Sequence, residues 1–296
     1  MTNSPFFSLI VPTYNRAQFI SKAIDSILKQ DYIDFELIIV DDGSTDNTEA
    51  VVKSVADGRI HYLKIKNVER GAARNAGIKA AKGKYISFLD SDDILYFNHF
   101  STAFHFLSIN NYPEVFHVAY EIITPEKKVL RKIDGLKDIN KMLIRGNPLS
   151  CNGVFIDNHT IFSNLFNEDR ALAGLEDWEL WLRIAAGHKF LACNTITSAI
   201  VQHEERSVLA MNFDKLILRA DKLIGYIQQS EEINKVYGQD VHKTIASIKT
   251  YVALHLAMAG APKSMIRDYF ISAISYYPFE LIRKRSFVIV KFMLGL

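Results

Sequence analysis

Three carboxylates fall within four consecutive positions, directly after an apolar run. The run is YISFL at 85–89, and Asp90, Asp92 and Asp93 follow it. Carboxylates this close repel one another and resist transfer out of water, so a cation or a set of hydrogen-bond donors is expected beside them. Mg²⁺ or Mn²⁺ in proteins is typically held by one or two carboxylates together with substrate phosphates. The cluster therefore predicts a divalent metal site.

The spacing of these side chains separates two roles. Side chains two residues apart on an extended segment point to the same side, so we expect Asp90 and Asp92 to address one site. Asp93 then points elsewhere and is expected to cap the next helix. For an isolated DxD pattern, a helix cap and a solvated turn would be the better interpretation. The position after a strand, with other polar strand ends nearby, favours the metal site.

The first hundred residues alternate between short apolar runs, which predict buried strands, and helically spaced apolar residues. The predicted strands are 6–11, 35–40, 60–65 and 84–89, and the predicted helices are 17–29, 44–56 and 71–83. This alternation is typical of an α/β fold with a mostly parallel sheet flanked by helices. Ligands bind such sheets beyond the carboxyl ends of the strands. We therefore expect the polar segments 12–15, 41–42 and 90–93 to meet in one crevice.

The remainder of the chain is less regular and then becomes helical. Strands are predicted at 114–123, 127–133 and 189–203, and helices at 175–187, 213–229, 239–259, 263–275 and 279–294. We expect an α/β catalytic domain over residues 1–207 and a helical C-terminal extension over residues 208–296.

Composition excludes several classes of protein. The 296 residues carry 35 Lys and Arg against 33 Asp and Glu, a net charge of +2 that gives no drive toward nucleic acid. Cys151 and Cys193 lack metal-type spacing, which favours reduced thiols in a cytoplasmic protein. The N-terminus lacks the pattern of a signal peptide, and no apolar run reaches the ~18 residues of a membrane span.

Four segments together resemble the family 2 glycosyltransferases, which have the GT-A fold. They are VPTYNR at 11–16, VDDGSTDNT at 40–48, ERGAARNAGIKAAKGKYISFLDSDD at 69–93 and LEDWELWLR at 175–183. The resemblance covers the first two-thirds of the chain and leaves the C-terminal third without a match. It implies an inverting, nucleotide-sugar-dependent transferase.

The resemblance implies nucleotide-binding roles around the first two strands. Pro12, Thr13 and Tyr14 would hold the base and ribose, and Asp41 would contact the base or ribose. A turn that caps the following helix is the alternative role for Asp41.

Further along the chain, Asn67 and Arg74 would help to bind the nucleotide and diphosphate, and Asp90 would contact the ribose or sugar. A solvated helix face is an equally good account of Arg74. Asp92 would ligate Mn²⁺ or Mg²⁺, which stabilises the charge on a departing nucleoside diphosphate. His203, after the last core strand, would touch the metal or diphosphate, although a lone histidine is more often structural.

The resemblance gives the role of catalytic base to Asp177. The alternative is that Glu176 and Asp177 simply favour the helix N-terminus through its dipole. One base without an evident second nucleophile suits a single displacement that inverts the anomer. A retaining mechanism would need a carboxylate under the sugar ring.

The predicted function is transfer of a hexosyl or N-acetylhexosaminyl group to a hydroxyl of a glycan or lipid-linked acceptor, in cell-surface polysaccharide biosynthesis. The resemblance favours a UDP-sugar donor. One alternative is a sugar nucleotidyltransferase, but the loop PTYNRAQF has no glycine. The other is a non-catalytic nucleotide-sugar-binding module, although every motif residue expected for activity is present.

The tail 279–296 combines Arg283, Lys284, Arg285 and Lys291 with a dense apolar face. It predicts either peripheral contact with an anionic membrane surface, near a lipid-linked acceptor, or a last helix packed onto the protein. In the first case the protein would work at the inner face of the cell membrane.

Overall fold

The computed structural model describes residues 4–203 and 212–295 and contains two compact units. The first unit comprises Met1–Ile139, Pro148–Arg170 and His188–Arg206, and the second comprises Asn140–Asn147, Ala171–Gly187 and Ser207–Leu296. The expected boundary between residues 207 and 208 lies outside the described residues, so the division expected there stays a prediction. Two segments that precede that boundary group with the C-terminal helices.

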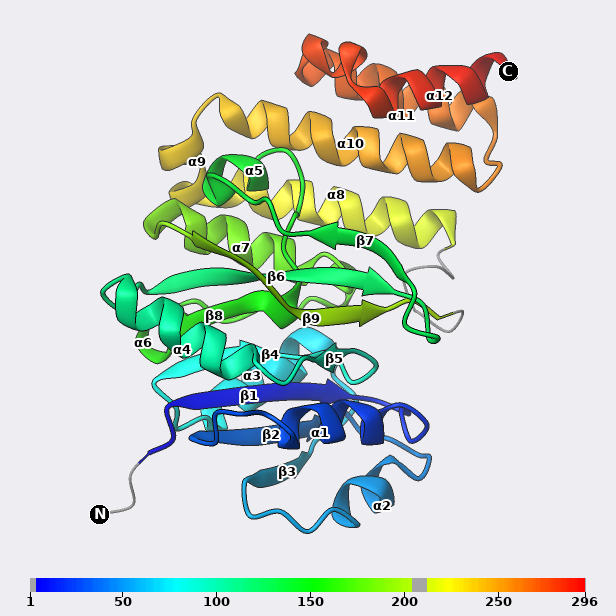
Figure 1. The fold of residues 1–296 in the computed structure, drawn as a ribbon. Helices are drawn as coiled ribbons and strands as arrows, with labels where there is room; N and C mark the ends of the chain where they lie inside the picture. Colours follow the sequence, from blue (N-terminus) through cyan, green and yellow to red (C-terminus); the bar gives the residue numbers. More distant parts are fainter. Residues whose placement is uncertain (1–3, 204–211, 296) are drawn as a thin grey trace. The chain divides into compact units, whose positions relative to one another are not determined.

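The first unit is built on one sheet, in which the described residues form nine strands. Their order is β3-β2-β1-β4-β8-β6-β9-β5, with β7 paired to β6 (Figure 1). β1 (Phe7–Thr13) pairs in parallel with β2 (Phe35–Asp41) and β4 (Tyr85–Phe88), and β2 pairs in parallel with β3 (Ile60–Lys64). Every residue of β1, β2 and β4 is buried, as expected for parallel strands covered on both faces.

The other half of the sheet is mixed. β8 (Val154–Asp157) runs antiparallel to β4 and to β6 (Val115–Ile123), and β5 (Ile94–Leu95) runs antiparallel to β9 (Leu191–Val201). β6 and β9 are parallel, whereas β6 and β7 (Val129–Ile133), which correspond to the strands predicted at 114–123 and 127–133, pair antiparallel. The predicted α/β class is confirmed, with the parallel pairs concentrated among the N-terminal strands.

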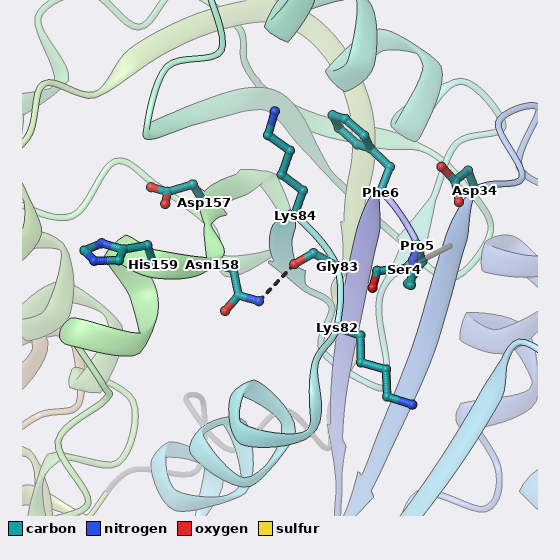
Figure 2. Close-up of a pocket in the computed structure, with 10 residues that line it drawn as sticks. All are labelled: Ser4, Pro5, Phe6, Asp34, Lys82, Gly83, Lys84, Asp157, Asn158 and His159. Carbon is teal, nitrogen blue, oxygen red and sulfur yellow. Dashed lines mark hydrogen bonds between the residues drawn. The ribbon is translucent and has the colours of Figure 1, made fainter. Parts of the chain in front are cut away.

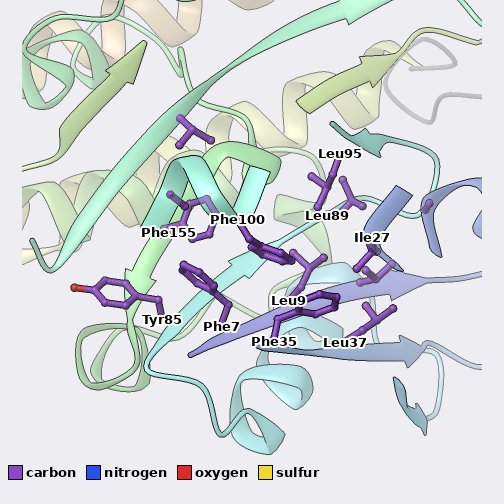
Figure 3. Packing of buried hydrophobic residues seen from close by; sticks show 14 of the residues in the cluster. Phe7, Leu9, Ile27, Phe35, Leu37, Tyr85, Leu89, Leu95, Phe100 and Phe155 are labelled. Atoms are coloured by element: carbon purple, nitrogen blue, oxygen red, sulfur yellow. The ribbon is translucent and has the colours of Figure 1, made fainter. Parts of the chain in front are cut away.

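Helices cover both faces of the parallel half, because alternate strand residues point to opposite faces. Phe7, Leu9 and Val11 of β1 share one core cluster with side chains of α1 and α4, part of which is drawn in Figure 3. Ile10 points to the opposite face and packs against α3, where a Cβ on Gly77 would lie 2.5 Å from Ile10 Cγ2. The unit contains α1 (Ile20–Leu28), α2 (Thr48–Lys53), α3 (Arg70–Ala80), α4 (His99–Ile109), η1 (Cys151–Gly153) and α6 (Asn158–Ser163).

Both cysteines lie in the first unit. Cys151 is in η1 and Cys193 is in β9, and both are buried. Neither forms a disulfide, and the prediction of reduced thiols stays a prediction.

The second unit is helical. It contains α5 (Ile139–Leu143), whose first residue is assigned to the first unit, then α7 (Glu176–Gly187), α8 (Phe213–Gln229), α9 (Glu231–Tyr237), α10 (Asp240–Met258), α11 (Lys263–Tyr276), η3 (Pro278–Ile282) and α12 (Lys284–Leu294). The short helix η2 (Arg170–Leu172) precedes α7 in the chain. Among the described helices, none combines the length and the apolar character needed to cross a bilayer.

The single helix expected over 279–294 is a wrong prediction. The chain forms η3 and α12, separated by Arg283 in an extended conformation with ψ 148°. The break lies beside Glu280, which is completely buried, and Arg283 lies 3.0 Å from its carboxylate.

Candidate active site

The acidic turn 90–93 follows the carboxyl end of β4, as predicted. Asp90, Asp92 and Asp93 each offer a carboxylate oxygen, and these three atoms lie within 4.8 Å of one another. Asp90 and Asp92 are partly exposed, whereas Asp93 is buried. A set of hard oxygen donors at this spacing fits Mg²⁺ or Mn²⁺.

Asp93 is fixed by hydrogen bonds to both carboxylate oxygens. Its Oδ1 accepts from the backbone N–H of Val201 at 3.0 Å, and its Oδ2 accepts from Nδ2 of Asn152 at 2.9 Å. The expectation that Asp93 caps the next helix is wrong, because α4 begins later and has Asn98 as its N-cap residue. Asp93 instead ties the acidic turn to the end of β9 and to η1.

Asp92 contacts basic side chains from two distant segments. Its Oδ2 lies 3.0 Å from Nε2 of His203 and 3.9 Å from Nε of Arg16. The His203 ring stacks on Phe19 with 4.6 Å between centroids, and its Nδ1 is buried without a hydrogen-bond partner among the described residues. His203 therefore lies at the acidic turn, while its role toward a metal stays a prediction.

Arg74 is a buried residue of α3, so the alternative of a solvated helix face is wrong. Its side chain is 2% exposed, and Nη2 donates to Oδ1 of Asp90 at 2.8 Å. The guanidinium carbon lies 5.3 Å from the centroid of the Phe166 ring. Arg74 thus brings one fixed positive charge to the crowded carboxylates.

Asp41 is completely buried at the carboxyl end of β2. Its Oδ1 accepts from the backbone N–H of Ser44 at 2.7 Å, and its Oδ2 accepts from the hydroxyl of Tyr62. Burial, together with this hydrogen bond to Asp41, raises the pKa of the Tyr62 hydroxyl. Asp41 therefore forms a turn but does not cap the following helix, because α2 begins at Thr48 with Asn47 as its N-cap residue. The contact of Asp41 with a nucleotide stays a prediction.

Pro12, Thr13 and Tyr14 lie at the carboxyl end of β1. The register between β1 and β4 ends at Ile10, so Pro12 falls where it removes no hydrogen bond to β4. Thr13 is buried, and its Oγ1 has no partner among the described residues. The Tyr14 side chain is 45% exposed and available to a ligand.

Hydrogen bonds clasp the loop after β1 to the loop after β2. The backbone N–H of Asn15 donates to Oγ of Ser44, and Oδ1 of Asn15 accepts from the backbone N–H of Thr45, both at 2.9 Å. Asn15 has φ 50°, a left-handed conformation that asparagine adopts more readily than most residues. The clasp fixes the two strand ends that carry Tyr14 and Asp41.

Asn67 lies exposed in the loop that leads into α3. Its carbonyl oxygen accepts from the guanidinium of Arg170. The same loop is held to the end of β2 by Asp42, whose carboxylate accepts from the backbone N–H groups of Val68 and Glu69 at 2.7 and 2.8 Å. Burial raises the pKa of Asp42 despite these two bonds.

Two residues at the turn had no role in the sequence analysis. Arg16 belongs to the VPTYNR motif, and its positive charge at a strand end could have identified it as a site residue. Asn152 belongs to no motif and no periodic pattern, yet its Oδ1 lies 3.3 Å from the backbone nitrogen of Asp90 while its Nδ2 binds Asp93.

Asp177 lies in the second unit, in the first turn of α7. Its Oδ2 accepts from Nδ2 of Asn147 at 2.9 Å, and its Oδ1 accepts from the backbone N–H of Trp178 at 2.7 Å. Trp178 and Trp181 are buried, so both are core residues and not exposed stacking surfaces. The carboxylate also stands where a helix dipole favours negative charge.

A cavity of about 550 Å³ opens at the other end of the strands, where β1 and β4 begin. Figure 2 shows its lining, which comes from residues 4–6, 82–84 and 157–159 and from Asp34. None of the predicted site residues lines it. The candidate site is therefore the acidic turn and its neighbouring strand ends.

Comparison with known proteins assigns the family. Residues 8–150 match the family described as Glycosyl transferase family 2. The UDP-Glc:alpha-D-GlcNAc-diphosphoundecaprenol beta-1,3-glucosyltransferase WfgD of Escherichia coli is 34% identical over 188 residues, which are 63% of this chain and 72% of WfgD. The chain belongs to glycosyl transferase family 2. This membership confirms the resemblance carried by the four motifs.

A second relative is much longer than the segment that matches this chain. An uncharacterized glycosyltransferase of Rickettsia felis is 37% identical over 191 residues, which are 61% of this chain but 31% of that protein. The chain thus spans about a third of the length of this relative.

Solved structures of glycosyltransferases have the same fold as this family member. The crystal structure of S. aureus TarS in complex with UDP-GlcNAc has a TM-score of 0.66 at 16% identity, and it covers 98% of this chain and 92% of that one. The mannosyltransferase PcManGT from Pyrobaculum calidifontis, in complex with GDP-Man and Mn²⁺, has a TM-score of 0.57 at 16% identity. The match covers 99% of this chain and 87% of that one. The predicted GT-A fold is confirmed.

Proposed function

We propose that the chain is an inverting glycosyltransferase that moves a hexosyl or N-acetylhexosaminyl group from a UDP-sugar to a hydroxyl of a lipid-linked glycan. Cell-surface polysaccharide biosynthesis, at the inner face of the membrane, is the process that such an acceptor serves. Family membership and relatives named glycosyltransferases support an enzyme of this type. The name of WfgD supports UDP-glucose and a diphosphoundecaprenol-linked acceptor, and the TarS complex supports UDP-GlcNAc.

The observation that carries the proposal is the acidic turn between Arg74 and His203. Asp92 and His203 would hold Mn²⁺ or Mg²⁺ there. When bound, such a cation stabilises the negative charge of a departing nucleoside diphosphate. Arg74 adds a fixed positive charge in a buried position, where it acts more strongly than it would in water.

The strand ends would bind the nucleotide. Tyr14 is exposed enough to stack on a base, and the buried hydroxyl of Thr13 lies beside it in sequence. Together with Pro12 and Asp41 they would hold the base and ribose. Asn67 would approach the diphosphate from the loop before α3.

The sugar end of the donor would be held by Asp90. It already accepts a hydrogen bond from Arg74, so a sugar or ribose hydroxyl would share that carboxylate. This arrangement would join recognition of the sugar to the cationic group beside the diphosphate.

Asp177 would act as the general base. Its hydrogen bond from Asn147 would orient the carboxylate toward an acceptor hydroxyl, whose proton it would take as the oxygen attacks the sugar. Attack from the face opposite the leaving diphosphate inverts the anomeric configuration. No covalent sugar intermediate is required.

A panel of nucleotide sugars, assayed with Mn²⁺ and scored by released nucleoside diphosphate, tests the proposal. We expect release with one UDP-sugar, loss of release with EDTA and loss in Asp177→Asn. Asp25→Asn is the matched control, because Asp25 is 68% exposed on α1 and is expected to leave the rate unchanged. Release of pyrophosphate from a nucleoside triphosphate and a sugar 1-phosphate, supplied in a separate assay, would favour the nucleotidyltransferase alternative. Binding of a nucleotide sugar without release would favour the non-catalytic module.

A further inference from the structure

Exposed apolar side chains are concentrated in η3 and α12. Ile282 is 70% exposed, Leu294 is 67% exposed and Phe287 is 65% exposed. Over residues 279–294, seven large apolar side chains are exposed: Phe279, Leu281, Ile282, Phe287, Val288, Phe292 and Leu294. A soluble monomer rarely gathers so many in one segment, and such patches mark interaction surfaces.

One side of α12 already packs inside the second unit. Ser286 and Ile289 are completely buried, and the helix contacts α10 and α11. At helical spacing, Lys284, Val288 and Lys291 share the opposite side, which is exposed. The helix is therefore held to the protein by a narrow stripe, and its broader face has no partner among the described residues.

A buried carboxylate determines which charges this face presents. Glu280 is completely buried, and its carboxylate oxygens lie 2.7 Å from Nη2 of Arg285 and 3.0 Å from Nε of Arg283. Oγ1 of Thr250 also lies 3.2 Å from the carboxylate. Both arginines are thus drawn toward the core of the unit and hold α12 in its orientation.

The exposed charge that remains is positive. Glu280 is the only Asp or Glu between residues 279 and 295, so no acidic side chain of this described segment is exposed. Lys284 and Lys291 are exposed, and Nζ of Lys263 reaches the C-terminal end of α12 near Gly295. The face combines exposed apolar side chains with lysines and no exposed acid.

We propose that η3 and α12 form a docking face for an anionic phospholipid bilayer. The phenylalanine, leucine and isoleucine side chains would enter the boundary between headgroups and acyl chains, while the lysine ammonium groups reach the phosphates. The positive charge of the exposed lysines is complementary to the negative charge of such a bilayer, which is why we propose this partner. The inference deepens the proposed function, since a lipid-linked acceptor lies in the same surface, but membrane binding is measured without turnover.

Flotation of the full-length protein with vesicles tests the proposal. We expect the protein to float with vesicles of phosphatidylcholine and phosphatidylglycerol in equal amounts, and to float less with phosphatidylcholine alone. Phe287→Glu should remove flotation. Lys284→Gln and Lys291→Gln should each weaken it by about fivefold on the anionic vesicles only.

Ile109→Glu is the matched control, because Ile109 is 64% exposed and lies in α4 of the first unit. It should float like the wild type. Circular dichroism melts of each variant would show whether the fold is retained, and Lys284→Gln supplies a second readout if Phe287→Glu unfolds.

Three results would overturn the proposal. The first is that the wild type does not float at all, and the second is that the folded Phe287→Glu variant floats as well as the wild type. The third is that Phe287→Glu still floats but no longer self-associates in light scattering, which would make the face a contact between copies of the protein. Nucleoside diphosphate release with a detergent-dispersed acceptor should persist in Phe287→Glu. An enzyme without turnover on any donor would contradict the proposed function and leave the flotation result standing.

Discussion

Each carboxylate of the acidic turn has a different polar partner. Asp90 binds the guanidinium of Arg74, Asp92 contacts the imidazole of His203, and Asp93 accepts from the amide of Asn152. These partners offset the repulsion that crowding creates. We infer that the contacts of these three carboxylates with other segments hold the turn in place, so that a cation and a diphosphate would meet a preformed site.

Replacing Asn152 by aspartate tests this residue-scale account. The change removes the donor to Asp93 and places another carboxylate beside it, in a position that is 1% exposed. We expect the free energy of unfolding to fall by about 3 kcal/mol, since a buried charge loses its donor and gains a like-charged neighbour. Urea denaturation measures the loss.

Asn158→Asp is the matched control. Nδ2 of Asn158 donates to the carbonyl of Gly83 at 3.0 Å, and the side chain is only partly buried. Its loss should be near 1 kcal/mol, the usual net value of one hydrogen bond. Equal losses in the two variants would show that Asn152 has no special role at the turn.

Residues that directly follow strand ends were predictable from the sequence, whereas residues that meet them only through tertiary contacts were not. The position of Asp92 was predictable because parallel strands end on the same side of a sheet, whereas His203 was implied by the family resemblance. The burial of Arg74 was not, because the pattern of α3 does not reveal which polar residue turns inward. Asn152 gave no signal, since its partners become neighbours only when β8 joins β4.

At the scale of elements, α3 positions Arg74 by packing closely on β1 and β2. A Cβ on Gly77 would lie 2.5 Å from Ile10 Cγ2 and 3.2 Å from Val40 Cγ2. Glycine is therefore required for this approach, although it costs helix stability.

Alanine substitutions at two helix-interior glycines should act in opposite directions. We expect Gly77→Ala to lower the free energy of unfolding by about 2 kcal/mol through overpacking. Gly225→Ala in α8 should raise it by about 0.7 kcal/mol, because nothing lies within 4 Å of the added Cβ and alanine favours the helix. Thermal melts of the two variants measure both effects. A stabilised Gly77→Ala would contradict the close packing of α3 on β1.

Several elements escaped prediction because their causes are not local. β8 has four residues and α6 has six, too few to show a period. α4, with sequence HFSTAFHFLSI, lacks the clear polar face that identifies an amphipathic helix. The break between η3 and α12 lies beside the buried Glu280, whose partners include Thr250 of α10, so 279–294 alone predicted one helix.

At the scale of the whole molecule, stability in acid depends on two buried histidines of the first unit. Burial lowers the pKa of His99 to about 3, and burial with the nearby His99 lowers the pKa of His117 to about 3. An unfolded histidine has a pKa near 6.5. Between these values the unfolded chain binds more protons, so stability is full above pH ~6.5 and falls as the pH decreases toward ~3.

The expected slope is about 1.4 kcal/mol per pH unit for each such histidine. His99→Gln should reduce the slope of the free energy of unfolding against pH by the contribution of one histidine. Urea denaturation from about pH 7 to pH 5 measures this slope. His159→Gln is a control, because His159 is exposed. An unchanged slope in His99→Gln would show that this residue is protonated equally in both states.

The division of the molecule differs from the pattern of its motifs. The segment LEDWELWLR continues the motifs of the first unit in the sequence, yet α7 groups with the C-terminal helices. Its packing explains why, since α7 contacts α8 and α9 within the helical unit. Nε1 of Trp178 also donates to the carbonyl of Leu143 at 2.9 Å in the same unit.

Calorimetric titration of UDP into the protein, with and without Mn²⁺, tests the central claim most directly. The claim is that the acidic turn holds a divalent cation together with a nucleoside diphosphate. We predict that wild type and Asp25→Asn bind UDP at least about tenfold more tightly with Mn²⁺, and that Asp92→Asn loses this difference. UDP binding that is equally tight in EDTA, or an undiminished Mn²⁺ effect in Asp92→Asn, would contradict it.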